Sequence, residues 1–463
     1  MKKMLIDIGV RVDAMSLDLA RDVGAVVRNA RAVEERVREV AEQASSLVIA
    51  TPRAAKLAQA AAGLFARYRW LQLRAAARDA SGGDDRPRLS EADHRDLARR
   101  AVAVIAELRG GVAKLGQLAS CRPDLVGAVW ASELAALQDD VPPIDTAAIR
   151  ARVDAEIGMQ WFADFDDAPI AAASLAQVHG ATLRDGTRVV VKVQVPGIEH
   201  AIAADIAALR AIATIDLPGA DLPTLADELA RALRGELDYR AEADALDALA
   251  ASGTTCVVPR PIRDASSERV LTMTRIDGEP LIAALDAATP ADRDRLLGAL
   301  VGEIAAQVLA RGFVHADPHP GNVMVTCDGR LALLDLGCVL SLARDDRRSY
   351  ARLALALGTG DATTAAAQLA GLGFVSAQPA LLVELASSLV SLMRPGQNTA
   401  ELDYRAAIDD QIARARAVGE LAIPPSFVLL GRVLATLAGL LARYKPDLQL
   451  HAIVAPHLFA AAS

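Results

Sequence analysis

The chain has 463 residues, 52% of them hydrophobic and only 3% aromatic, so its length favours two or three domains with cores of alanine, leucine and valine. A formal net charge of −8 argues against a general nucleic-acid binder, and four scattered cysteines favour free thiols in a reducing cytoplasm. We expect neither a secretory signal nor a membrane-spanning helix, since apolar runs of the required length are interrupted by charges.

Residues 1–85 predict helices, and within them the segment 43–78 is basic and contains no acid. Apolar and aromatic side chains such as Tyr68 and Trp70 lie among its bases, a pattern that can bind an anionic membrane surface. The alternative, that the segment packs on the acidic body of the same chain, stays open. The six bases are Arg53, Lys56, Arg67, Arg69, Arg74 and Arg78.

A polar linker, Ser81–Pro87, precedes a helical region that begins with Ser90 as a predicted N-cap. This region contains the tetrapeptide KLGQ, from Lys114 to Gln117, and reaches a boundary at residues 141–143. The spacing of the tetrapeptide alone is compatible with a close helix crossing at Gly116 that has no functional role.

Residues 160–200 change to the two-residue period of strands. An alanine-rich stretch precedes a turn at Asp185-Gly186 and then the run RVVVKVQV, which contains Lys192. A lysine in a strand normally faces solvent at a sheet edge, but it can also reach the phosphates of a nucleotide, as a strand lysine does in kinases.

A helical pattern covers residues 198–250 and carries the acids Glu236, Asp238 and Glu242. In one continuous helix, Asp238 and Glu242 share a face, so they either need a nearby cation or form a solvated surface. Further strands are predicted at residues 257–259 and 269–276, followed by a helix over 281–311.

The stretch 313–337 combines two acids and an amide in a short loop and hairpin. Asp317 lies in a proline-rich loop, Asn322 closes it, and a two-residue turn at Asp328-Gly329 returns the chain to Asp335. We expect the two arms to bring Asn322 and Asp335 near one another, with Asp317 just outside.

This set is the one that phosphoryl transfer requires, with one carboxylate to orient a hydroxyl and an amide and a carboxylate to hold Mg²⁺. The simpler alternative is an ordinary loop between a helix and a strand. We interpret His315 and His319 as hydrogen-bonding supports of the loop, because their spacing is not that of a zinc site. Beyond residue 341 the chain predicts helices, and the last apolar stretch, which contains Arg432 and Arg443, is expected to be a buried helix.

Five motifs that occur in order across residues 90–340 resemble the UbiB/ADCK (AarF) family of atypical protein-kinase-like proteins. They are the KxGQ signature Lys114–Gln117, the alanine-rich loop Ala171–Gln177, the strand lysine Lys192, the ExD acids Glu236 and Asp238 followed by Glu242, and the set Asp317, Asn322 and Asp335. Two positions depart from the usual pattern, with Leu336 in place of phenylalanine and Ala245 in place of asparagine.

The resemblance implies a two-lobed, predominantly helical α+β fold of the protein-kinase type, with a small antiparallel N-lobe sheet and an N-terminal helical KxGQ extension. The expected segments are 1–85 (N-terminal helices), 86–145 (KxGQ extension), 146–281 (N-lobe) and 282–463 (helical C-lobe). In the implied site, Lys192, held by Glu242, binds the ATP phosphates, and Asp317 is the catalytic acid. Mg²⁺ is held by Asn322 and Asp335. The nucleotide is covered by Ala172, Ala173 and Ser174, and a lid contains Lys114, Gln117, Glu236 and Asp238.

The function implied by the resemblance is an atypical kinase or ATPase that binds Mg-ATP and supports ubiquinone or other isoprenoid-lipid biosynthesis. Its substrate would be small or lipid-like, its partners lipid-biosynthetic enzymes, and its location the cytoplasm or the inner face of the membrane. Two alternatives stay open: a nucleotide-gated scaffold without phosphoryl transfer, and a small-molecule kinase of the aminoglycoside or choline type. The KxGQ and alanine-rich motifs argue against the second.

Overall fold

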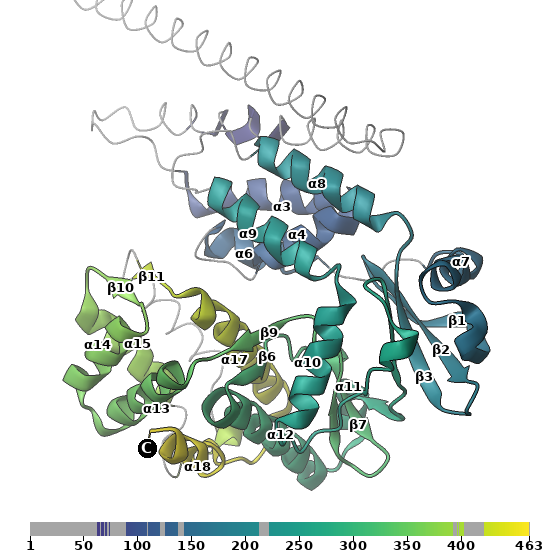
Figure 1. Cartoon of the computed structure of the whole chain (residues 1–463). Helices are drawn as coiled ribbons and strands as arrows, with labels where there is room; N and C mark the ends of the chain where they lie inside the picture. The colour runs from purple at the N-terminus through teal and green to yellow at the C-terminus, as the bar shows by residue number, and fades with distance from the viewer. Residues whose placement is uncertain are drawn as a thin grey trace, which may run out of the picture. The chain divides into compact units, whose positions relative to one another are not determined.

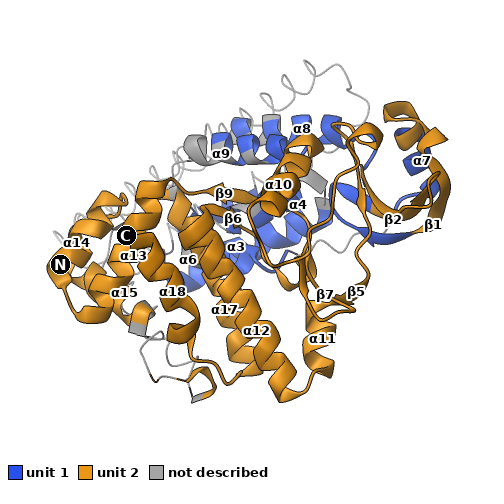
Figure 2. Cartoon of the chain, turned by 60° about the horizontal axis from the view of Figure 1, so that its bottom comes forward, with its two compact units in different colours: residues 1–152, 169–177, 194–237 blue, residues 153–168, 178–193, 238–463 orange. Residues whose placement is uncertain are grey.

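The computed structural model describes residues 63–64, 66–68, 70–71, 74, 89–108, 110–120, 126–137, 143–212, 222–391, 396, 398–401 and 421–462. The chain forms two compact units (Figure 2). Unit 1 comprises residues 1–152, 169–177 and 194–237, and unit 2 comprises residues 153–168, 178–193 and 238–463. Most of the basic segment 43–78 lies outside the described residues, so its membrane role stays a prediction.

Unit 1 is a helical body with its own apolar core. Leu115, Leu134, Ile202 and Leu233 meet in this core, each contributed by a different helix. Ser90 caps the first of these helices as predicted, because its Oγ accepts a hydrogen bond from the Asp93 amide at 3.2 Å. The helices are α3 (Glu91–Leu108), α4 (Gly110–Ser120), α6 (Ala128–Leu134), α8 (Ile198–Ile212) and α9 (Leu222–Gly235).

Gly116 of α4 lies in close contact with the side chains of neighbouring segments. A Cβ atom at this position would collide with the side chain of Leu137 and lie 3.3 Å from Cγ2 of Ile105. The glycine of the KLGQ tetrapeptide therefore has a packing role, as the simpler interpretation expected. Two bases of the N-terminal region also pair with α3, Arg67 with Asp96 at 3.0 Å and Arg74 with Asp93 at 2.6 Å.

A four-stranded sheet has the order β1-β2-β3-β4. Lys192 lies on β3 opposite Leu271 of the antiparallel strand β4, and β3 has a neighbour on both sides. The sheet-edge position considered for this lysine is therefore wrong, and its environment must come from what covers the sheet. Val189, Val191 and Val193 point to the buried face in alternation with it. The strands are β1 (Phe162–Ala172), β2 (Ala176–Leu183), β3 (Arg188–Gln194) and β4 (Val270–Thr274).

The predicted helix over residues 198–250 is not continuous. After α9 ends at Gly235 the chain turns, and α10 (Tyr239–Ala251) starts afresh with Asp238 as its N-cap. The Asp238 side chain accepts a hydrogen bond from the Arg240 amide at 3.1 Å, which satisfies one of the free donors at the start of a helix. Asp238 and Glu242 thus do not share a helix face, contrary to expectation.

The strands of the 313–337 stretch take part in two small antiparallel sheets, β5-β7-β8 and β6-β9. The hairpin pairs Val323 with Leu333, and its loop comprises the three residues Cys327–Gly329, because Thr326 donates to the Arg330 carbonyl at 2.9 Å. The loop is therefore one residue longer than the predicted two-residue turn, and its last residue, Gly329, is in the left-handed region with a φ of 77°. The strands are β5 (Gly278–Pro280), β6 (Phe313–His315), β7 (Val323–Thr326), β8 (Leu331–Leu333) and β9 (Val339–Ser341).

Helices make up most of the rest of unit 2. In Figure 1, α13, α14 and α15 lie side by side around the core that contains Leu353, Leu369 and Leu382. Within the described part of the chain, α17 is the one helix that is long and apolar enough to span a membrane by length and composition, over Ser426–Tyr444. The bounds are α11 (Leu281–Ala287), α12 (Pro290–Ala305), η3 (Ala306–Arg311), α13 (Arg344–Thr359), α14 (Ala362–Gly371), α15 (Pro379–Ser391), α17 (Pro425–Tyr444), α18 (Leu450–Ala462), and the paired strands β10 (Val375–Ser376) and β11 (Leu421–Ala422). The residues of one further helix, α7 (Thr146–Glu156), are divided between the two units.

Candidate active site

Lys192 lies between two carboxylates of unit 2. Its Nζ is 2.7 and 2.9 Å from the carboxylate oxygens of Glu242 and 3.2 Å from Oδ2 of Asp335. The exposed fraction of the Glu242 side chain is 4%, against 47% for Asp335, so the lysine joins a buried acid to a solvent-facing one. The ring centroid of Tyr239 is 5.2 Å from the same nitrogen, which adds a cation–π contact.

The charge state of Lys192 follows from these neighbours. Burial alone lowers the pKa of a lysine, but the carboxylates of Asp335 and Glu242 outweigh it and hold the pKa of Lys192 well above its ordinary value. The side chain is therefore an ammonium ion at neutral pH, the form that binds phosphate oxygens. Because the pKa of Lys192 is raised in the folded state, its ion pairs contribute to the free energy of unfolding in a pH-dependent way. This contribution is fully present below the ordinary lysine pKa of about 10.4 and is lost as the pH rises through the raised pKa.

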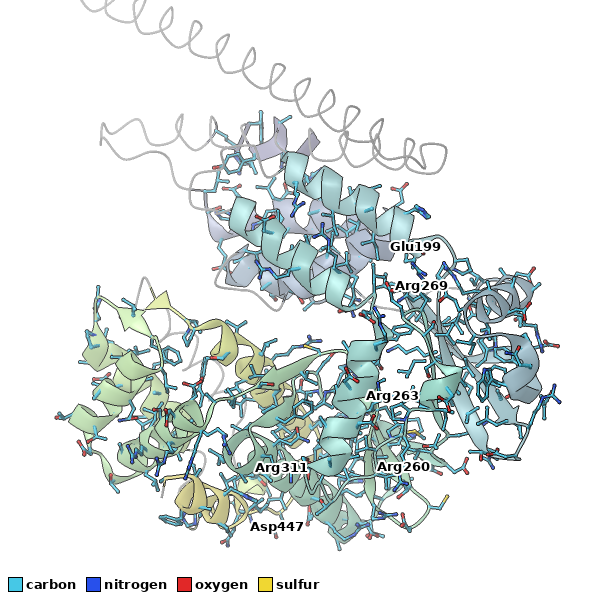
Figure 3. The ribbon with its side chains drawn as sticks, viewed as in Figure 1. Glu199, Arg260, Arg263, Arg269, Arg311 and Asp447 are labelled. Carbon is cyan, nitrogen blue, oxygen red and sulfur yellow. The ribbon has the colours of Figure 1, made fainter. Side chains whose placement is uncertain are left out.

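The position of Glu242 depends on how α10 is held. Arg263 lies beside this helix (Figure 3) and pairs with Asp244 at 2.7 Å and with Asp247. The first residue of the helix, Tyr239, donates its amide hydrogen to the Glu268 carbonyl at 3.0 Å. These contacts fix α10 at its start and along its length. Glu242, in the first turn of α10, therefore faces Lys192 of β3.

Asp335 has an uncommon backbone conformation. Its φ is 46°, in the left-handed region that side chains other than glycine seldom adopt. The Gly337 amide donates to its Oδ1 at 3.1 Å, and a Cβ atom on Gly337 would lie 3.2 Å from the same oxygen. Strain of this kind persists where the surrounding structure holds it, and it is concentrated at functional sites.

Asn322 lies next to this acid through the hairpin. The Leu334 amide donates to the Asn322 carbonyl at 2.8 Å, one step beyond the β7–β8 register. Nδ2 of Asn322 donates a hydrogen bond to the Asp317 carbonyl at 3.1 Å. The side-chain oxygen of Asn322 is therefore the atom able to bind a cation. The hydrogen bonds of Asn322 thus link Asp317 to the strand end that carries Asp335.

Asp317 is paired with a residue that the sequence interpretation did not assign to the site. Its Oδ2 is 2.8 Å from Nη2 of Arg432 on α17, and the two side chains are 25% and 33% exposed. From the sequence, Arg432 was only an interruption of an apolar helix. An arginine inside such a helix needs an acidic partner, and that requirement was the signal that could have pointed to it.

The two histidines support the loop through hydrogen bonds. His315 is fully buried, and its Nδ1 accepts a hydrogen bond from the Asp317 amide at 3.3 Å. His319 Nδ1 accepts one from the Gly321 amide at 3.2 Å. Burial lowers the pKa of His315, and the nearby carboxylates of Asp335 and Asp317 offset this only in part. Among the described residues no group of three His, Cys, Asp or Glu side chains is placed to hold a metal ion.

A buried network lies behind the loop. The His315 amide donates to Oε1 of Gln307 at 2.9 Å, and Gln307 lies on η3, which is a π-helix. Gln307 in turn donates to the buried Glu303 at 2.9 Å, and Glu303 also pairs with Arg311. Short π-helical segments are frequent beside functional sites, and this one orients the backbone that precedes Asp317.

The predicted lid residues divide between the two units. Lys114 pairs with Glu236 at 3.1 Å, and Nε2 of Gln117 donates to the Leu137 carbonyl at 3.2 Å, all within unit 1. Asp238 belongs to unit 2, where it pairs with Arg240 at 2.8 Å. The role of these residues as a lid stays a prediction.

The alanine-rich loop lies between β1 and β2. Ala172 is the last residue of β1, and the Ala173 amide donates to the Ala176 carbonyl at 2.8 Å, which closes a tight turn around the buried Ser174. Alanine has less backbone freedom than the glycine that brings a loop close to phosphates. The predicted contact of these three residues with nucleotide is not tested by the structure.

The donor set fits a magnesium nucleotide. Mg²⁺ binds oxygen ligands and is commonly held by one or two protein side chains, with phosphate and water completing the shell. Asn322 and Asp335 supply an amide oxygen and a carboxylate on neighbouring hairpin residues, and Lys192 supplies an ammonium ion 3.2 Å from that carboxylate. Cations and metal-binding oxygens at such short distances are what a bound polyphosphate requires.

Comparison with known proteins identifies similar proteins that are described as kinases or kinase-like. Residues 136–369 match the family model of the ABC1 atypical kinase-like domain. The chain is 32% identical to a Xylella fastidiosa protein named "Probable protein kinase UbiB", a match that covers 80% of this chain and 71% of that protein. It is also 32% identical to an aarF domain-containing protein kinase of Arabidopsis thaliana. That match covers 74% of this chain and 50% of the plant protein.

A solved structure shares the fold. The Mycobacterium tuberculosis protein Rv3197, solved in complex with erythromycin, matches 80% of this chain and 97% of its own length with a TM-score of 0.57 and 24% sequence identity. The expected kinase-like α+β fold, predominantly helical with small antiparallel sheets, is confirmed.

Proposed function

The chain belongs to the ABC1 family of atypical kinase-like proteins, which includes the UbiB and aarF proteins, and on that premise we propose that it binds Mg-ATP and acts as a phosphotransferase or ATPase. The observation that carries the proposal is the position of the Lys192 ammonium ion, 2.7 Å from Glu242 and 3.2 Å from Asp335. This is the constellation with which kinase-like sites hold a triphosphate and its metal.

Each residue has a distinct role in the proposed reaction. Lys192, oriented by Glu242, binds phosphate oxygens of ATP. Asn322 and Asp335 hold Mg²⁺, which when bound neutralises charge on the phosphates. Asp317 orients the acceptor hydroxyl or a water molecule for in-line attack on the terminal phosphorus. Because phosphoryl transfer depends mainly on positioning and charge, the contacts that fix these side chains account for most of the expected rate.

The proposed biological role is support of ubiquinone or other isoprenoid-lipid biosynthesis, and it rests on the resemblance to the UbiB group. A small or lipid-like substrate fits this role. Quinone and metabolite profiling of a deletion strain checks it, with an altered prenyl-quinone pool as the expected result. An unchanged pool would contradict this biological role without bearing on the Mg-ATP site.

Replacing Asp335 with asparagine is expected to abolish Mg-dependent binding of ATP. The substitution removes the carboxylate charge from the proposed metal site and from the Lys192 contact at 3.2 Å. The measurement is the rise in melting temperature of the full chain on addition of ATP with Mg²⁺, compared with ATP and EDTA. The wild-type chain should show a metal-dependent rise that the variant lacks.

Asp328→Asn is a matched control on the same hairpin. Asp328 pairs with Arg330 at 2.7 Å, away from the Lys192 contacts, so its loss should leave the metal-dependent rise unchanged. Undiminished stabilisation of Asp335→Asn by Mg-ATP would show that the metal is not held at this acid.

A further inference from the structure

Arg432 is the cation beside the proposed catalytic acid. It comes from α17, more than 100 residues after Asp317, and its Nη2 lies 2.8 Å from Oδ2 of that acid. Val428, one turn earlier on the same helix, is buried. Arg432 therefore projects from a packed part of the helix, and its charged end emerges at the site.

The distance between Arg432 and Asp317 is fixed by a shared core. Val314 of β6, Leu342 and Leu430 of α17 form one buried cluster, with Val308 and Tyr350 packed against it. Val314 is three residues before Asp317, and Leu430 is two residues before Arg432. The same apolar contacts that dock α17 on β6 therefore hold the guanidinium group against the carboxylate.

Asp317 is restrained at both ends. Its backbone carbonyl accepts a hydrogen bond from Asn322 at 3.1 Å, and one of its carboxylate oxygens is bound by Arg432. The terminal torsion of an aspartate is broad when the side chain has no such partner. With Oδ2 engaged, the orientation of Oδ1 is determined as well.

We propose that Arg432 is a positioning residue for phosphoryl transfer: it binds Oδ2 of Asp317 so that Oδ1 faces the acceptor hydroxyl or water. This inference rests on the proposed function and adds a residue from the C-terminal helix to its site. A guanidinium group suits the role because it is planar, permanently charged and able to donate further hydrogen bonds.

An ion pair of purely structural importance is the competing explanation, and α17 itself provides the control. Arg443 on the same helix pairs with Asp286 at 3.2 Å, with side chains 55% and 52% exposed. Both arginines interrupt the apolar surface of one helix and both bind an aspartate of unit 2. Only Arg432 binds the acid of the proposed site, so a specific effect on turnover should be confined to it.

The experiment compares Arg432→Gln, Arg432→Lys and Arg443→Gln in the full chain. Steady-state ATP turnover gives kcat and KM, and melting with and without Mg-ATP gives binding. For Arg432→Gln we expect kcat to fall about 10–100-fold, the effect of a misplaced catalytic group, with KM and the Mg-ATP shift retained. Arg432→Lys should recover part of kcat, and Arg443→Gln should leave it unchanged.

A double-mutant cycle provides a readout that does not depend on turnover. If the two residues interact as proposed, the changes in melting temperature caused by Arg432→Gln and Asp317→Asn in the nucleotide-free chain will not add. An unchanged kcat in Arg432→Gln, an equal fall in Arg443→Gln, or additive changes in melting temperature would each overturn the inference. A wild-type chain without an Mg-ATP shift would instead overturn the proposed function itself, so the two failures are distinguishable.

Discussion

Replacing Asp317 with asparagine should lower ATP turnover by about 10²–10⁴-fold, the usual contribution of a general acid–base residue, while leaving Mg-ATP binding in place. The amide keeps the shape of the side chain but cannot accept a proton from the attacking hydroxyl or water. Asn322 and Asp335 are untouched, so the metal-dependent rise in melting temperature should persist. The measurement is turnover at saturating Mg-ATP together with that rise.

This variant also separates the enzyme from the scaffold alternative. A scaffold needs only bound nucleotide. If the protein is a scaffold, a strain that carries Asp317→Asn in place of the wild-type gene should therefore have the wild-type phenotype. Full complementation by this variant would contradict a role for phosphoryl transfer. Asp286→Asn is the matched control, since Asp286 also pairs with an arginine of α17 but at an exposed position away from Lys192.

Replacing Lys192 with methionine should both remove ATP turnover and destabilise the chain. Glu242 is 4% exposed and would lose the ammonium ion that lies 2.7 Å from it. Removal of one partner of a buried ion pair costs about 3–5 kcal/mol in the free energy of unfolding. Chemical denaturation of the nucleotide-free chain measures this loss, and turnover assays measure the loss of the phosphate contact.

The difference in the free energy of unfolding between the wild-type chain and Lys192→Met should also depend on pH, which provides a second check. Because the pKa of Lys192 is raised in the folded state, the difference between wild type and Lys192→Met should be constant at neutral pH and should shrink only above pH ~10.4. Arg188→Met is the control on the same strand. Arg188 is half-exposed and pairs with Asp277, so its loss should change the stability little. Equal destabilisation by both variants would contradict a special role for Lys192.

The parts of the site that are close in sequence could be predicted. The turn residues and alternating apolar residues of 313–337 determine a hairpin, and a hairpin necessarily brings Asn322 near Asp335. The actual loop is one residue longer than predicted, because a two-residue type I′ turn needs a positive φ at both Asp328 and Gly329, and only Gly329 has one. Element boundaries depend on such local choices, whereas the pairing depends on the whole pattern.

Contacts that depend on distant segments could not be derived from spacing. The spacing around Lys192 leaves a sheet edge and a phosphate-binding position equally open until β4, about 80 residues later, is known to pair with β3. Arg432 reads as an interruption of an apolar helix until α17 is known to pack on β6. The break at Asp238 was missed because alanine-rich flanks favour helix throughout, while the capping hydrogen bond that starts α10 depends on one side chain.

In the proposed site, Lys192, Asn322 and Asp335 bind one and the same magnesium nucleotide. A crystal structure of the full chain grown with Mg²⁺ and a non-hydrolysable ATP analogue tests this most directly. We expect phosphate oxygens bound to Nζ of Lys192 and a metal ion coordinated by the side-chain oxygens of Asn322 and Asp335. An ordered analogue bound elsewhere, with these three side chains in contact only with protein, would contradict it.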